Sequence, residues 1–152
     1  MTMPLWVRSA LIEPVPAIES RKNGPLGVLL VEDDHLNQRV AWSMLQRLGH
    51  QVDVAEDGRG ALDAVHRRRY DVVLMDVQMP VMDGLEATRQ IRRDARLAQP
   101  YIVAVTAYTQ KGDREDCLAA GMDEYLGKPF GLRELERVLT AGRVRVRVGA
   151  VS

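Results

Sequence analysis

The chain of 152 residues is long enough for one ordinary globular domain and too short for two full-sized ones. Its 21 basic and 21 acidic residues cancel, so it lacks the positive field with which proteins bind nucleic acids, and we expect no direct contact with them. The single cysteine, Cys117, excludes an internal disulfide, and no apolar run approaches the ~20 residues of a membrane helix. The composition therefore predicts a cytoplasmic domain without membrane contact.

The pattern divides the chain into three parts. Residues 1–25 contain four prolines and a polar stretch with no helical or alternating period, which is typical of an extension or linker. Residues 26–141 hold all the regular apolar segments and form the predicted domain. Residues 142–152 are a C-terminal tail, in which Arg and Val alternate from Arg143 to Val148. We interpret this alternation as a frayed tail rather than an added edge strand.

Strand-like and helix-like segments alternate five times within the domain. The predicted strands are Leu26 to Val31, Gln51 to Ala55, Asp71 to Met75, Tyr101 to Thr106 and Glu124 to Leu126. The predicted helices are His35 to Leu48, Gly58 to Arg68, Gly84 to Arg96, Thr109 to Ala120 and Leu132 to Ala141. This order predicts an α/β fold with a parallel sheet covered by helices on both faces, so that the carboxyl ends of the strands meet at one edge.

Acidic side chains follow the first and third predicted strands. Glu32, Asp33 and Asp34 come directly after the first strand, and Asp76 comes directly after the third. If these two strands are neighbours, Glu32 or Asp33 meets Asp76, and carboxylates that close require a cation. Hard oxygen ligands in a small open site favour Mg²⁺, whereas a dedicated loop for Ca²⁺ is missing. Taken singly, such residues more often cap a helix or face water.

A hydroxyl and a lysine complete the set at the same edge. Thr106 ends the fourth strand, and Lys128 follows the fifth. A lysine opposite carboxylates can bind phosphoryl oxygens, and a threonine hydroxyl can bind another of them. Asp76 is then the candidate nucleophile towards phosphorus, forming an acyl phosphate. The run Arg67 to Arg69, in contrast, is interpreted as solvated side chains that complement a helix dipole.

Four segments resemble the receiver domain of response regulators and hybrid histidine kinases, over about residues 26–141. They are Val28-Leu29-Leu30-Val31-Glu32-Asp33-Asp34, Asp76-Val77-Gln78-Met79-Pro80-Val81-Met82-Asp83-Gly84, Ala104-Val105-Thr106-Ala107 and Ala119-Ala120-Gly121-Met122-Asp123-Glu124-Tyr125-Leu126-Gly127-Lys128-Pro129-Phe130. The resemblance implies a flavodoxin-like (βα)5 fold with five parallel strands in the order 2-1-3-4-5.

The resemblance also implies how the residues share the chemistry. Asp76 would be the phosphoacceptor, and Mg²⁺ would be bound by Asp33, by Asp76 and by the backbone carbonyl of Gln78, with Glu32 acting through water. Gln78 and Tyr108 lie two residues beyond the phosphoacceptor and the hydroxyl residue. We expect these two side chains to flank the phosphoryl group and to tune its lifetime.

Switching in this family couples the hydroxyl residue to an aromatic ring. Here the pair is Thr106 and Tyr125, three residues before Lys128. Phosphorylation would draw the hydroxyl inward and the ring would follow, as a shift between two populated states. The same resemblance implies a cis bond between Lys128 and Pro129.

The expected partner is a histidine kinase or a histidine phosphotransfer protein. The sequence resembles the receivers of hybrid kinases most, so the parent protein is expected to be a hybrid histidine kinase. In the family, the surface formed by the fourth helix, fifth strand and fifth helix often mediates contacts with output partners. A homodimer through this surface is therefore a further possibility. No kinase nucleotide-binding motif and no DNA-binding module is found in these residues, so this chain alone is not expected to be an enzyme beyond promoting its own phosphorylation and dephosphorylation.

Three other functions compete with this interpretation. A Mg²⁺-dependent aspartyl phosphatase also uses an Asp nucleophile, but a second acid typically stands two residues later, where this chain has Gln78. A receiver-like binding module that is never phosphorylated would normally lack one of the site residues, and none is missing. Nucleotide binding finds no support, because neither glycine-rich phosphate-binding pattern follows a predicted strand.

Overall fold

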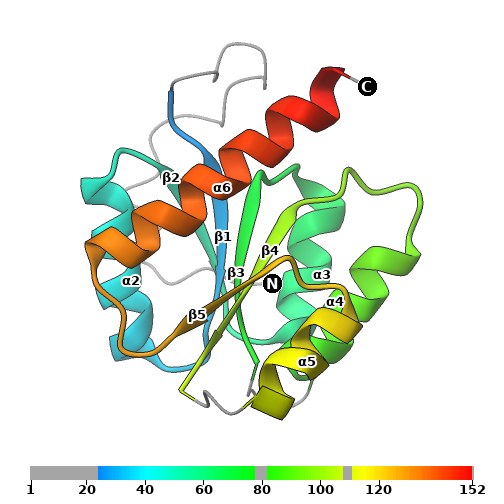
Figure 1. The fold of residues 1–152 in the computed structure, drawn as a ribbon, viewed down its shortest axis with the longest axis horizontal. Coiled ribbons are helices and arrows are strands. Elements are labelled where there is room, and N and C mark those ends of the chain that lie inside the picture. Colours follow the sequence, from blue (N-terminus) through cyan, green and yellow to red (C-terminus); the bar gives the residue numbers. More distant parts are fainter. Residues whose placement is uncertain (1–23, 78–81, 108–110, 152) are drawn as a thin grey trace.

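The computed structural model describes residues 24–77, 82–107 and 111–151, which form an α/β fold (Figure 1). The strands are β1 (Gly27–Val31), β2 (Gln51–Ala55), β3 (Val72–Asp76), β4 (Tyr101–Thr106) and β5 (Glu124–Gly127). The helices are α2 (His35–Arg47), α3 (Gly58–Arg67), α4 (Gly84–Arg93), α5 (Lys111–Ala120) and α6 (Leu132–Val151). None of the helices in these ranges is long and apolar enough to cross a membrane.

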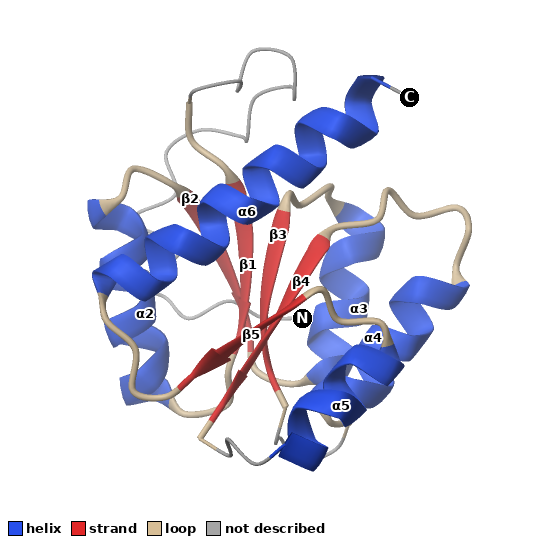
Figure 2. Cartoon of the chain, in the orientation of Figure 1, coloured by secondary structure: helices blue, strands red, loops and turns tan. Residues whose placement is uncertain are grey.

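The five strands form one parallel sheet in the order β2-β1-β3-β4-β5, as the sequence predicted. Figure 2 shows that the strands fan out from one another and that all of their carboxyl ends point to the same edge. Because β1 lies directly between β2 and β3, the turn after β1 faces the end of β3. This order brings the predicted acidic residues to one place.

Helices cover both faces of the sheet because successive side chains of a buried strand point in opposite directions. Val28 and Leu30 of β1 pack with α2 and α6, whereas Leu29 and Val31 pack with α3, α4 and α5. All of β1, including these four side chains, is buried. Burial of each such side chain contributes about 1.5–3 kcal/mol, so the two cores account for the uninterrupted apolar runs in the sequence.

Aspartates begin three of the helices. Asp34 accepts a hydrogen bond from the main-chain N–H of Asn37 at 2.8 Å, and Asp57 and Asp83 cap α3 and α4 in the same way. Each satisfies a helical N–H group that has no partner within the helix, and each is favoured there by the positive end of the helix dipole. Some of the acidic residues at the carboxyl edge of the sheet therefore cap helices.

Two helices end three or more residues away from the predicted position. Helix α4 ends at Arg93 rather than Arg96, because the Asp94 carboxylate accepts the main-chain N–H of Arg96 at 3.0 Å and turns the chain. Helix α6 does not end at Ala141 but continues to Val151. It crosses the sheet at Gly142, where a Cβ atom would lie 2.7 Å from Val72. Glycine permits this close crossing, and no proline follows it to end the helix.

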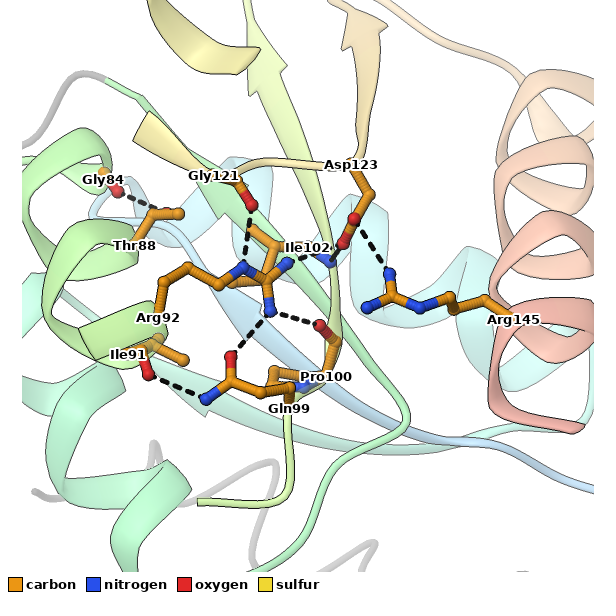
Figure 3. Close-up of polar contacts among 10 residues, drawn as sticks. All are labelled: Gly84, Thr88, Ile91, Arg92, Gln99, Pro100, Ile102, Gly121, Asp123 and Arg145. Atoms are coloured by element: carbon orange, nitrogen blue, oxygen red, sulfur yellow. Dashed lines mark hydrogen bonds and ion pairs between the residues drawn. The ribbon is translucent and has the colours of Figure 1, made fainter. Parts of the chain in front are cut away.

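A half-buried arginine, Arg92, joins the amino ends of β4 and β5 to α4 (Figure 3). The guanidinium of Arg92 donates to the carbonyls of Gly121 and Pro100 at 2.8 and 2.9 Å and to Gln99 Oε1 at 2.8 Å. It also pairs with Asp123 Oδ2 at 2.6 Å. Four acceptors from two segments, one before β4 and one before β5, thus converge on one side chain of α4.

Asp123 extends this network to α6. Its Oδ2 also accepts the main-chain N–H of Ile102 at 2.9 Å, at the start of β4. Its Oδ1 accepts from Arg145 at 2.9 Å, and Figure 3 shows this arginine reaching over from α6. The part of α6 beyond the predicted end is therefore held against the sheet by an ion pair that sequence reasoning did not anticipate.

Candidate functional site

The acidic turn follows β1 at the carboxyl edge of the sheet. Glu32 is 5% exposed, and its main-chain N–H donates to the carbonyl of Ala55 at 3.0 Å, which extends the pairing of β1 with β2. Asp33 is exposed to solvent. Asp34 caps α2, as described above, and its N–H donates to Glu32 Oε2 at 3.2 Å. The turn thus directs two carboxylates towards β3 and uses the third to begin a helix.

Asp76 is the last residue of β3 and is 7% exposed. Carboxylate oxygens of Glu32, Asp33 and Asp76 all lie within 4.8 Å of one another. Partial burial raises the pKa of Asp33, and its contact with Glu32 raises it further. The crowding of these like charges in a partly desolvated site is the arrangement that the sequence predicted, and a divalent cation would relieve it.

Lys128 lies opposite these carboxylates. Its Nζ is 2.6 Å from Glu32 Oε1 and 3.5 Å from Asp76 Oδ2. Burial lowers the pKa of the ammonium group, but the hydrogen bond to Glu32 and the charge of Asp76 outweigh it, so the pKa of Lys128 lies above its ordinary value. The group is therefore fully charged at neutral pH. The Lys128–Pro129 bond is cis, which confirms the expectation.

Thr106 and Tyr125 come from adjacent strands. Thr106 ends β4 and is 4% exposed, and its carbonyl accepts the main-chain N–H of Lys128 at 2.8 Å. Tyr125, in β5, is half-buried and packs against the core on the side of α3, α4 and α5. Burial raises the pKa of the Tyr125 phenol. The two residues lie in neighbouring strands, and the switching role predicted for them stays a prediction.

The segment after Asp76 approaches the start of α4 closely. The N–H of Gly84 donates to the carbonyl of Val77 at 3.2 Å, and a Cβ atom on Gly84 would lie 2.2 Å from the carbonyl oxygen of Asp76. Only glycine fits this approach without a shift of the backbone. Gln78 and Tyr108, for which a tuning role was predicted, lie outside the described residues.

The donor set fits magnesium. Three carboxylates from two strand ends form an oxygen-rich cluster at the rim of the sheet, where one of them is exposed and two are buried. Mg²⁺ prefers oxygen ligands, keeps several waters and commonly uses one or two carboxylates. Asp33 and Asp76 could hold the ion directly, with Glu32 close enough to act through water.

A cavity of about 360 Å³ opens beside this cluster. Asp76 and Lys128 line it, together with mostly apolar residues that include Met44 from α2 and Phe130 after β5. On the outer face of α2, Leu36 and Val40 are 71% and 49% exposed. The reactive edge of the sheet is therefore bordered by apolar surface on the side of α2.

A second buried polar cluster was missed by sequence reasoning. Asp53 of β2 is 3% exposed, and its Oδ2 accepts hydrogen bonds from the Tyr70 hydroxyl and from Arg68 Nη1, the latter at 2.9 Å. Burial and the neighbouring Asp53 raise the pKa of Tyr70. The interpretation of Arg67 to Arg69 as wholly solvated is therefore wrong for Arg68, because an arginine stem can follow the protein surface to a buried partner.

The family model for the response regulator receiver domain matches residues 28–140. The chain belongs to this family. It is a receiver domain of two-component or phosphorelay systems.

Curated relatives of this receiver include sensor proteins and hybrid kinases. It is 44% identical over 115 residues to the aerobic respiration control sensor protein ArcB of Escherichia coli K12, covering 75% of this chain and 15% of the relative. It is 39% identical over 122 residues to the hybrid signal transduction histidine kinase I of Dictyostelium discoideum, covering 76% of this chain and 7% of the relative. The chain thus spans a small part of the relatives that it matches.

Two solved structures bear on the site. The receiver domain of sensor histidine kinase PA1611 from Pseudomonas aeruginosa PAO1, with a magnesium ion coordinated in its active-site cleft, is 45% identical, with a TM-score of 0.73 over 79% of this chain and 98% of that one. The complex of the Saccharomyces cerevisiae phosphotransfer protein Ypd1 with the receiver of Ssk1 gives 31% identity and a TM-score of 0.70 over 77% and 88%.

Proposed function

We propose that this receiver accepts a phosphoryl group on Asp76 from a phosphohistidine of a kinase or phosphotransfer protein. The observation that carries the proposal is the position of Lys128 Nζ, 2.6 Å from Glu32 and 3.5 Å from Asp76, beside a cluster of three carboxylates. In the reaction, an Asp76 oxygen bonds to phosphorus while the bond from phosphorus to the histidine nitrogen breaks. The imidazole leaves with the electron pair and takes up a proton.

The remaining residues bind and orient the groups that react. Asp33, Asp76 and the backbone carbonyl of Gln78 would hold Mg²⁺, and Glu32 would act through water. Bound there, Mg²⁺ supplies positive charge to the transferring phosphoryl oxygens. Lys128 binds one of these oxygens as a point charge. The magnesium ion in the cleft of the PA1611 receiver supports this assignment.

Phosphorylation then changes the protein-interaction surface. The hydroxyl of Thr106 binds a phosphoryl oxygen, and Tyr125 moves inward with it. The two residues lie in the paired strands β4 and β5, of which β5 contacts α5. Gln78 and Tyr108 set how long the phosphoryl group lasts. The output surface, formed by α5, β5 and α6, is also the face through which a homodimer would form.

A protein phosphodonor is favoured by the apolar border of the site. The exposed Val40 of α2 lines the cavity beside Asp76, and Leu36, four residues earlier on the same helix, is also exposed, so a partner that covers this helix brings its histidine to the carboxylate. The complex of Ypd1 with the Ssk1 receiver supports a phosphotransfer protein in this role. The similarity to a hybrid kinase supports a parent protein of that kind, which would place the domain in the cytoplasm.

Mass spectrometry after incubation with a small phosphodonor and Mg²⁺ tests the proposal. We expect the wild type to gain one phosphoryl group only with Mg²⁺, and Asp76→Asn to gain none. Asp57→Asn is the matched control, because it replaces another carboxylate that follows a strand and keeps a side chain that caps α3. If a folded wild type that binds Mg²⁺ gains nothing even from a phosphorylated transfer protein, the domain is a binding module and not a phosphoacceptor.

A further inference from the structure

An amide side chain is buried behind the acidic turn. Gln38, on α2, has no exposed surface, although it packs where α2 meets the apolar core. Its Nε2 donates to the main-chain carbonyl of Glu32 at 2.6 Å. Its Oε1 has no hydrogen-bond partner in the part of the chain that the structure describes. Packing alone would be served better by leucine or methionine, which leave no buried acceptor unsatisfied.

Gln38 contacts the turn on both sides of Asp33. Its side chain holds the carbonyl of Glu32, and its main-chain N–H donates to the carbonyl of Asp34 at 2.9 Å. The N–H of Glu32 is held in turn by Ala55 at 3.0 Å. The peptide between Glu32 and Asp33 is therefore fixed in orientation by the side chain of a single residue on α2.

This arrangement matters because Asp33 is exposed. Its side chain is not packed into the core, so the direction of the carboxylate depends on its contact with Glu32 and on the peptide that precedes it. A rotation of that peptide would turn the carboxylate away from Asp76, with which it shares the cluster. Residues that hydrogen-bond to a metal ligand and orient it typically lower metal affinity about 10–100-fold when they are removed.

We propose that Gln38 is a positioning residue for the metal site: its amide orients the Glu32–Asp33 peptide so that Asp33 faces Asp76. The inference rests on the proposed function, because it assigns to Gln38 a part in the binding of Mg²⁺. It concerns affinity for the ion and not the transfer of the phosphoryl group, since Gln38 touches neither Asp76 nor Lys128 through any bond seen here.

The test compares Gln38→Met with Leu45→Val in the complete chain. Methionine keeps the length of glutamine but cannot donate to Glu32. Leu45 is fully buried on the same helix and in the same core, so its truncation weakens packing without touching the acidic turn. The dissociation constant of Mg²⁺ is measured by calorimetry, and the rate of phosphorylation by a small phosphodonor is measured across Mg²⁺ concentrations.

We expect Gln38→Met to weaken Mg²⁺ binding about tenfold. At saturating Mg²⁺ its phosphorylation rate should approach that of the wild type, and Leu45→Val should bind Mg²⁺ as the wild type does. An unchanged Mg²⁺ affinity in folded Gln38→Met, or an equal loss in Leu45→Val, would overturn the assignment while leaving the proposed function intact. A wild type that binds no Mg²⁺ would overturn both. A wild type that binds the ion but is not phosphorylated would overturn the proposed function alone.

Discussion

Replacing Arg92 by alanine removes four hydrogen-bonded contacts between α4 and the amino ends of β4 and β5 (Figure 3). A hydrogen bond to a charged group contributes roughly 1.5–3 kcal/mol to stability, and the full amount is lost when water cannot reach the remaining partner. The Arg92 and Asp123 side chains are 20% and 21% exposed, so water replaces part of what is lost. We therefore expect the free energy of unfolding to fall by about 3 kcal/mol in total, and the melting temperature by roughly 6–12 °C.

Urea unfolding followed by circular dichroism measures this loss, and Arg93→Ala is the matched control. Arg93 is the next residue of the same helix, but it is 68% exposed and pairs only with Glu86 at 3.3 Å among the ion pairs seen for it. Its removal should change stability by less than about 0.5 kcal/mol. A loss below about 1 kcal/mol in Arg92→Ala, or equal losses in the two variants, would show that the Arg92 network is not what holds these segments together.

Three further changes test other parts of the structure. Burial, with the charge of Arg143, lowers the pKa of His50 from 6.5 to about 4. The unfolded state therefore binds a proton that the folded state does not, and stability should fall by roughly 3 kcal/mol as the pH drops from 6.5 to 4. Urea titrations of His50→Gln should lack this part of the slope, and identical slopes would contradict it. Tyr70→Phe removes a donor to a buried carboxylate and should cost about 1–3 kcal/mol in the same assay; unchanged stability would be evidence against the bond. Gly84→Ala places a Cβ atom against the carbonyl of Asp76, and the phosphorylation rate measured by mass should fall about 100-fold, whereas a wild-type rate would contradict the close approach.

Local patterns were sufficient for the architecture and for the central site. The apolar runs specify strands buried on both faces, and the regular alternation with helical segments specifies parallel neighbours. Because parallel strands all end at one edge, residues at or directly after strand ends, such as Glu32, Asp76 and Lys128, are brought to the same edge of the sheet. Their convergence could therefore be predicted. In the structure, the Glu32 and Asp76 carboxylates both lie within hydrogen-bonding distance of Lys128 Nζ.

The resemblance to the family supplied what spacing alone could not. The pairing of Thr106 with Tyr125 and the cis bond before Pro129 follow from no local rule of composition or periodicity. The cis bond is confirmed. The roles of the two side chains stay predictions that the proposed experiments address.

Only the tertiary structure decided which polar side chains find hydrogen-bond partners within the fold. Gln38, His50 and Arg68 stand in sequence contexts that also suit exposed residues, yet they bind Glu32, Leu26 and Asp53 respectively. The same holds for the last turns of α6, where Arg145 reaches Asp123 across 22 residues of sequence. The physical reason is that a side chain's partner depends on how helices cross the sheet and on which way each side chain points, and neither is contained in the periodicity of a single segment.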